Sequence, residues 1–371
     1  MTRAGRDRRT SPSRRTLLTG ALGGLGALTA GCVGRTPGAP EAPAATPAPP
    51  SPTAPPVPPV PPAPVRLSLP ALPAYAPHPG EVEPDCKVAA VAYVTAALTT
   101  GPASFPPGAP APDVPAALAA RLGGTGLDPR PGASLAPLLP VRGISAVQTV
   151  YPQYGGLDAG RRTASVMVVL QQLSLDPAAP DVLRRRSVIV DVRLRRRGGW
   201  GVEQVLVPAV DHELDVPARP QVQRVFDDDR VWLPDPARFD LLQEDVDVRV
   251  AELLSTFAER WPVHVQEVRS GHPVTVFDKA HTSNHTLGRA VDVSGLDGVM
   301  VVDRDACPWR EAMEIAAVVA GASEVGGPVD LGDRPFFSDA VHQDHVHVGW
   351  DHPLPGPGGP GAGPGAGPGA A

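Results

Sequence analysis

Between residues 81 and 210, the spacing of apolar residues changes from that of helices to that of strands. Residues 86–98 and 113–122 carry apolar side chains at helical spacing, so each segment predicts a helix. Strands are predicted next, in segments rich in Val, Ile and Leu, over residues 144–151, 162–173, 186–194 and 199–207. The Arg-Arg-Gly-Gly sequence at 196–199 predicts a hairpin turn between the last two strands. We therefore expect an α+β unit with one curved sheet over a helix.

A second patterned region, residues 234–352, predicts another α+β unit. One apolar helix face, ended by Pro262, is marked by Phe239, Leu242, Val246, Val250, Leu253, Leu254, Phe257 and Trp261. A further helix is expected at 309–320, and short strands are expected at 263–268, 289–293, 299–302 and 345–350. These elements predict a small, mostly antiparallel sheet with its polar residues at the strand ends. Residues 211–233 are acidic and interrupted by proline, so we expect them to link the two units.

The two ends of the chain lack the pattern of a folded core. Proline and glycine, 49 and 39 of the 371 residues, cluster there. Residues 33–80 are rich in Pro and Ala and predict a disordered, extended tether, and residues 353–371 predict a disordered Gly/Pro-rich tail.

Residues 1–32 resemble a twin-arginine lipoprotein signal. Arg14 and Arg15 precede an apolar run that is short for a membrane span, and small residues precede Cys32. The resemblance implies cleavage before Cys32 and attachment of lipid to that cysteine. It also implies a protein that is exported and anchored to the outer face of the cytoplasmic membrane. The alternative, an uncleaved membrane anchor, likewise places the rest of the chain outside the cytoplasm.

Charge argues against nucleic acid as a partner. The whole chain has a formal net charge of −6, and removal of residues 1–31, which contain six arginines and one aspartate, leaves −11. Two further cysteines, Cys86 and Cys307, remain after Cys32. In an exported protein they could form a disulfide between the two units or remain separate buried thiols.

Two short motifs near the C-terminal end carry the candidate chemistry. The first is Ser-Asn-His-Thr-Leu-Gly-Arg-Ala-Val-Asp at 283–292, and the second is His-Gln-Asp-His-Val-His at 342–347. Two imidazoles and one carboxylate from these motifs could hold one zinc ion and leave its fourth position open. Because side chains alternate along a strand, His345 and His347 share one face while Val346 and Val348 face the core.

The motif Ser-x-His-x-x-Gly-x-Ala-x-Asp followed by His-x-His resembles the zinc peptidases grouped as lysostaphin-type enzymes, D-Ala-D-Ala metallopeptidases and hedgehog domains. The resemblance covers residues 234–351, about the last third of the chain. It implies that His285, Asp292 and His347 bind zinc. The spacing of the second motif is similar to that of murein endopeptidases, and the context of the first is similar to that of D,D-carboxypeptidases.

Three other roles are expected near this site. The carboxypeptidases commonly place a glutamate where this chain has Asp344, whereas the endopeptidase pattern points to His345, so either residue could be the general base. Arg269 is a candidate to bind a terminal carboxylate of the substrate, with a surface arginine as the alternative. Ser283 and His342 are expected to lie beside the ligands and support them.

The resulting hypothesis is a membrane-tethered zinc peptidase that hydrolyses peptidoglycan stem peptides. The alternative is a noncatalytic lipoprotein with a peptidase-like fold that binds zinc or wall peptides. The unit at 81–210 resembles cone-shaped cystatin-like or nuclear-transport-factor-like domains in its order of elements, and we expect it to place the protein or bind a protein partner.

Overall fold

The computed structural model describes residues 69, 72–101, 113–139, 143–176, 179–208, 217–277, 279–318 and 320–354. The expected signal segment with Cys32, residues 33–68 of the expected tether and residues 355–371 of the expected tail lie outside the described residues. The described residues form a mixed α/β structure with one antiparallel and one mixed sheet.

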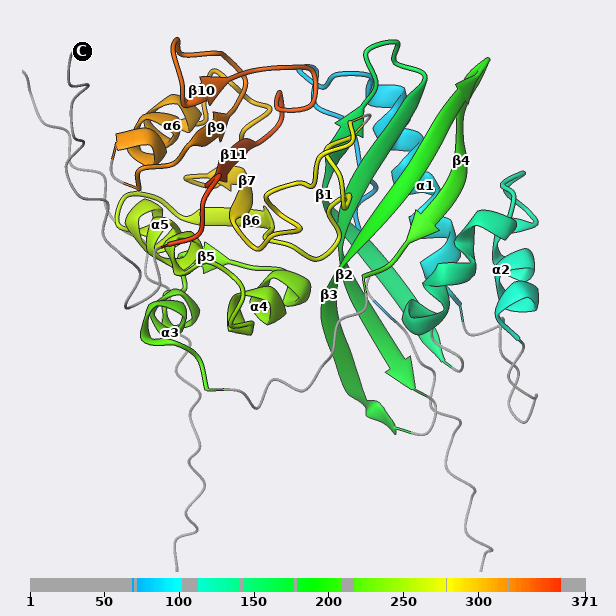
Figure 1. Ribbon diagram of the computed structural model, residues 1–371. Coiled ribbons are helices and arrows are strands. Elements are labelled where there is room, and N and C mark those ends of the chain that lie inside the picture. Colours follow the sequence, from blue (N-terminus) through cyan, green and yellow to red (C-terminus); the bar gives the residue numbers. More distant parts are fainter. Residues whose placement is uncertain are drawn as a thin grey trace, which may run out of the picture. The chain divides into compact units, whose positions relative to one another are not determined.

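The first sheet is an antiparallel meander of four consecutive strands in the order β1-β2-β3-β4 (Figure 1). Its strands are β1 (Ile144–Leu157), β2 (Thr163–Asp176), β3 (Ala179–Arg197) and β4 (Gly199–Leu206). The predicted hairpin turn is confirmed, because Arg197 pairs with Gly199 and Gly198 has a positive φ of 85°. β1 runs further than predicted and ends at Leu157.

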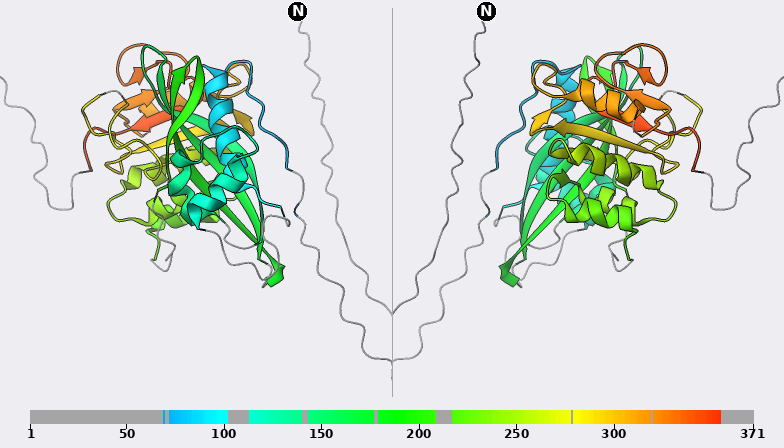
Figure 2. Two further views of the ribbon diagram at one scale, coloured as in Figure 1. Left: turned by 90° about the vertical axis from the view of Figure 1, so that its right-hand side faces the viewer. Right: turned by 90° about the vertical axis from the view of Figure 1, so that its left-hand side faces the viewer.

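Helices cover one face of this sheet (Figure 2). They are α1 (Pro84–Leu98), α2 (Val114–Leu122) and the 3₁₀ helix η2 (Arg130–Leu138). Along β2, Val166, Val168 and Leu170 are buried in the core beneath these helices, whereas Met167 and Val169 are buried on the other face. β2 therefore has both faces in apolar surroundings, which explains its nearly continuous run of apolar residues.

The second sheet has the strand order β10-β9-β11-β7-β6-β5, with β8 paired to β7. The neighbours β5/β6 and β9/β10 are parallel, and the others are antiparallel. Its strands are β5 (Val231–Trp232), β6 (Val263–Glu267), β7 (Ala290–Leu296), β8 (Val299–Met300), β9 (Glu324–Gly326), β10 (Phe336–Phe337) and β11 (Val346–Gly349). The core of this unit contains residues of this sheet and of the helices α3 (Pro220–Asp227), α4 (Asp235–Leu242), α5 (Val248–Ala258) and α6 (Trp309–Val318).

Two expectations for this region are corrected. The single helix expected from Phe239 to Trp261 is divided into α4 and α5, because Gln243 is extended and Asp247 caps α5 by accepting a hydrogen bond from the Arg249 amide at 3.0 Å. The segment expected to be a linker contains α3 and β5, and its apolar side chains Val222, Val225 and Val231 are buried in the second core.

Both α+β regions, each with its sheet, belong to one compact part of the chain that begins at Ala63. Cys86 and Cys307 are free, buried thiols, as in the second of the two alternatives considered for them.

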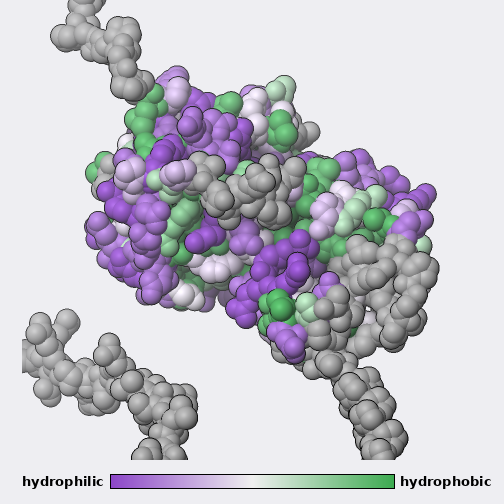
Figure 3. Space-filling view, turned by 90° about the horizontal axis from the view of Figure 1, so that it is seen from below, coloured by the Kyte–Doolittle hydropathy of each residue, from purple (hydrophilic) through white to green (hydrophobic). Residues whose placement is uncertain are grey.

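Hydrophilic residues predominate on the face shown in Figure 3. Within the described ranges, no helix combines the length and the apolar character needed to cross a bilayer.

Candidate metal centre

Two paired strands, β7 and β11, hold Asp292 and His347 side by side. The two residues are register partners in an antiparallel pair, and the same pairing joins Val291 to Val348. All four valines that flank these polar residues, Val291, Val293, Val346 and Val348, are fully buried in the second core. The alternation predicted from the sequence is therefore confirmed, and the core valines fix the direction in which Asp292 and His347 point.

A tight turn before β7 brings in His285. Gly288 has a φ of 67° and its amide donates to the His285 carbonyl at 2.8 Å. A Cβ atom at Gly288 would also collide with the Asp245 carbonyl. The His285 Nδ1 atom lies 2.7 Å from the Val268 carbonyl, which can only accept, so Nδ1 carries the proton and Nε2 keeps its lone pair for a ligand.

The ligand atoms of the three residues converge. His285 Nε2 lies 3.1 Å from His347 Nδ1 and 3.2 Å from Asp292 Oδ1, and the last two atoms are 2.9 Å apart. Ligands at zinc bond lengths on a tetrahedron are about 3.3 Å apart. The far nitrogen of His347, Nε2, lies 3.6 Å from the carboxylate of Glu324. This buried set could therefore hold a metal ion.

The electrostatics of these residues are consistent with a cation at this place. Burial alone would raise the pKa of Asp292, but the imidazoles of His345 and His285 hold that pKa well below its ordinary value. Burial would lower the pKa of His347, yet hydrogen bonds to Asp292 and Glu324 raise it to about 9. The negative charge gathered here thus favours a positive charge between these residues.

The two candidate bases, Asp344 and His345, are hydrogen-bonded to each other. His345 Nδ1 lies 2.6 Å from Asp344 Oδ1, and the other carboxylate oxygen of Asp344 lies 2.5 Å from the Nζ atom of Lys87. Both oxygens of Asp344 are therefore occupied. The second ring nitrogen of His345, Nε2, instead faces Asp292 Oδ2 at 3.5 Å, at the edge of the ligand set.

Lys87 comes from α1, outside the region that carries the motifs. It is fully buried and forms ion pairs with Glu81 and Asp344, and its Nζ atom donates to the Tyr151 hydroxyl at 3.1 Å. Burial raises the pKa of Glu81, which Lys87 partly offsets, whereas Lys87 and His345 lower the pKa of Asp344 against the effect of its burial. Lys87 thereby favours the ionised form of Asp344.

The sequence motifs did not reveal Lys87, but a signal was present. Lysine occurs at only two positions of the chain, Lys87 and Lys279. Lys87 lies within the apolar helix, and Cys86, Ala90 and Val91, which lie at helical spacing around it, are buried. A buried lysine needs a partner, so its position in this pattern predicts an acidic contact.

Of the other site residues predicted from the sequence, Ser283 and His342 lie near the ligand set and Arg269 does not. Ser283 Oγ accepts a hydrogen bond from the backbone amide of His285 at 3.2 Å. The ring centroids of His342 and His345 are 5.0 Å apart. Both residues therefore lie beside the ligand set. The Arg269 guanidinium, in contrast, lies 2.6 Å from Asp245 Oδ2, and Arg269 is not among the described residues that line the cleft over the site.

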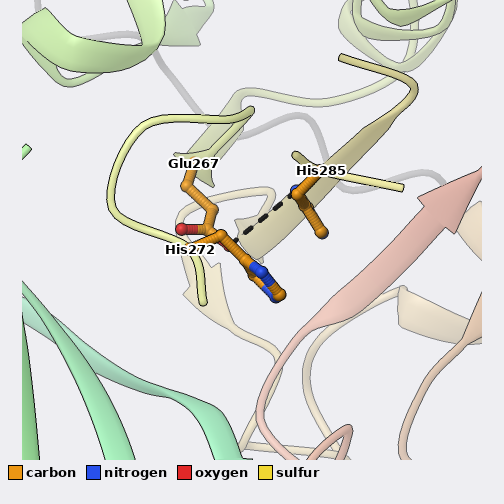
Figure 4. Close-up of side chains that lie close together, drawn as sticks. All are labelled: Glu267, His272 and His285. Carbon is orange, nitrogen blue, oxygen red and sulfur yellow. Dashed lines mark ion pairs between the residues drawn. The ribbon is translucent and has the colours of Figure 1, made fainter. Parts of the chain in front are cut away.

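A second group of metal-ligand type shares His285 with the first. Glu267, His272 and His285 lie close together (Figure 4), with Glu267 Oε1 3.8 Å from a nitrogen of each ring. The His285 nitrogen on this side already donates to Val268, and complete burial beside Asp292 raises the pKa of Glu267 well above its ordinary value. A neutral carboxyl group is a poor metal ligand, so the set with Asp292 and His347 is the better site.

A cleft of about 870 Å³ opens over the ligand set. Its walls come from both sheets, because it is lined by the end of β1 and the following turn and by residues of the second unit that include His285, His345 and His347. At Gly156 of β1, a Cβ atom would overlap the ring of Phe277, so glycine allows the two walls to meet there. Arg161, which forms an ion pair with Glu83, and Arg334 also line the cleft.

Comparison of this chain with models of protein families, with curated proteins and with solved structures found no match.

Proposed function

We propose that this protein is a zinc peptidase that hydrolyses peptidoglycan stem peptides, as a D,D-carboxypeptidase or an endopeptidase. The convergence of His285 Nε2, Asp292 Oδ1 and His347 Nδ1 in a buried set beneath a cleft carries the proposal. Zinc held there would polarise a peptide carbonyl and lower the pKa of water.

Within this proposal, His345 is the general base and Asp344 orients it. Asp344 Oδ1 fixes the proton of His345 on Nδ1, which leaves Nε2 free to take a proton from the attacking water and pass it to the leaving amine. Each oxygen of Asp344 already accepts a hydrogen bond, from His345 or from Lys87, whereas His345 Nε2 faces Asp292 at 3.5 Å. These contacts support His345 over Asp344 among the two bases considered from the sequence.

The other parts of the proposal concern the place and the partners of the protein. Lipid on Cys32 would hold it at the outer face of the cytoplasmic membrane, near wall peptides. The first sheet, which packs against helices on one face, supports a relationship to cystatin-like domains and a role in placing the protein or binding a partner.

The test uses protein from residue 33 onward, measurement of bound zinc, and mass spectrometry of D-alanine or peptides released from purified peptidoglycan fragments. His347→Ala should lose both metal and activity, because it removes a ligand. His345→Ala should keep the metal and lose about 10²–10⁴-fold in kcat. Wild-type protein that binds zinc tightly but cleaves no wall peptide would instead support the noncatalytic alternative.

A further inference from the structure

A glutamine of the first sheet reaches the metal centre of the second. Gln153 of β1 is fully buried, and its Nε2 atom donates to Asp292 Oδ2 at 2.5 Å. The reverse orientation of the amide would turn its oxygen toward the carboxylate, so only the donor orientation gives an attractive contact. The contact joins residues 139 positions apart in the sequence.

The two oxygens of Asp292 consequently have different surroundings. Oδ1 faces the nitrogens of His285 and His347, at 3.2 and 2.9 Å. Oδ2 faces Gln153 at 2.5 Å and His345 Nε2 at 3.5 Å. Gln153 thus holds the oxygen that points away from the ligand set.

The position of Gln153 is fixed by the packing of the sheets. Gln153 pairs with Met167 across β1 and β2. From the second sheet, the fully buried Gln266 donates to the backbone carbonyls of Tyr151 and Met167, at 3.2 and 3.1 Å. The backbone just before Gln153 and that of its cross-strand partner are therefore tied to β6, which adjoins β7 and Asp292.

We propose that Gln153 is a positioning residue for the metal site, supplied by the first sheet, which makes Asp292 bind the metal through Oδ1 alone. The inference deepens the proposed function and rests on it in so far as a metal occupies the ligand set. A hydrogen bond to the distal oxygen orients the carboxylate and keeps it from binding through both oxygens, so that a coordination position stays open for water.

The experiment measures zinc affinity by competition with a chelating dye for the wild-type protein and for Gln153→Leu and Gln153→Met. We expect the Kd for zinc to rise about 10–100-fold in both variants. In Co²⁺-substituted protein, we expect the visible absorption bands to weaken in the variants, because the freed carboxylate can add a ligand and a higher coordination number gives weaker bands. The methionine variant nearly preserves side-chain volume, so one folded variant remains if leucine disturbs the packing.

Two buried glutamines provide matched controls. Gln172 of β2 is buried in the same sheet but donates to Ser145 Oγ and the Leu138 carbonyl rather than to Asp292, so Gln172→Leu should leave zinc affinity unchanged. Gln266→Leu loosens the backbone contact that helps to place Gln153 but keeps the Gln153 side chain, so we expect a smaller loss of zinc affinity than in Gln153→Leu. A loss of affinity in Gln266→Leu equal to that in Gln153→Leu would assign the effect to sheet packing and overturn the proposal.

Unchanged zinc affinity and unchanged Co²⁺ spectra in folded Gln153 variants would also overturn the proposal. These readouts do not depend on hydrolysis. Wild-type protein that binds zinc but cleaves no wall peptide would therefore refute the proposed peptidase activity while leaving the role of Gln153 intact. Wild-type protein that binds no zinc would refute both.

Discussion

The Nζ atom of Lys87 lies 2.5 Å from Asp344 Oδ2, although 257 positions separate the two residues in the chain. Both side chains are almost completely buried. The pair joins α1 to the segment that precedes β11, and His345 is bonded to the same carboxylate. A charge pair thus connects the first helix of the described chain to the proposed base.

Lys87→Met should lower the free energy of unfolding by about 3–5 kcal/mol, because it leaves the Asp344 carboxylate buried without its cation. Urea unfolding measures the effect. Lys279→Met, which changes the exposed second lysine, should stay within about 0.5 kcal/mol of the wild type. The double variant Lys87→Met/Asp344→Asn should recover part of the loss. Equal stability of Lys87→Met and the wild type would contradict a strong pair.

Asp344→Asn should reduce kcat about 10²–10⁴-fold with little change in KM or zinc content, because His345 would lose the acceptor that fixes its proton on Nδ1. Steady-state kinetics on a stem peptide, together with metal analysis, check this. A variant with wild-type kcat would show that the orientation of His345 does not depend on Asp344.

Gly156→Val should weaken the contact between β1 and the loop that carries Phe277, because any Cβ atom there overlaps that ring. The expected cost is about 1–3 kcal/mol of stability, with a higher KM because the cleft wall shifts. Gly201→Ala is the control, since the nearest atom to its added Cβ is 3.9 Å away. If both variants behave alike, close approach at Gly156 is not required.

The two thiols of Cys86 and Cys307 should react slowly in the folded protein, because burial raises their pKa values to about 12 and about 11. A folded-state pKa above the unfolded value near 8.5 also means that stability should fall as pH rises between about 8.5 and 11. Thiol titration of Cys32→Ser protein, folded and in guanidinium, tests both the burial and the free state. Fewer than two reactive thiols in guanidinium would indicate a disulfide.

The direction in which two of the candidate metal ligands point could be predicted because strand alternation is a local pattern. Val291 and Val293 flank Asp292, and Val346 and Val348 flank His347, so strand alternation alone orients the polar residues. The break between α4 and α5 was missed, because the apolar spacing continues through it and only the cap at Asp247 ends the regularity.

Gln153 and Lys87 could not be assigned from the sequence in the same way. Their partners, Asp292 and Asp344, lie 139 and 257 positions away, and no local pattern states which strands meet. The sheet order of the second unit likewise depends on pairings between distant segments, such as β11 with β7. Long-range pairing of this kind is decided by packing of the whole core rather than by neighbouring residues.

β2 contributes side chains to two cores at once: Val168 lies in the core beneath the helices, and Met167 lies in a small core on the other face, against which Trp232 of β5 packs. A strand shared in this way makes melting cooperative, since neither core can lose its packing without exposing the other. Calorimetry should therefore record one heat-absorption peak for the described part of the chain. For the same reason, the elements that pack on either face of β2 could be replaced by those of another protein only if the replacement supplied an equivalent apolar face.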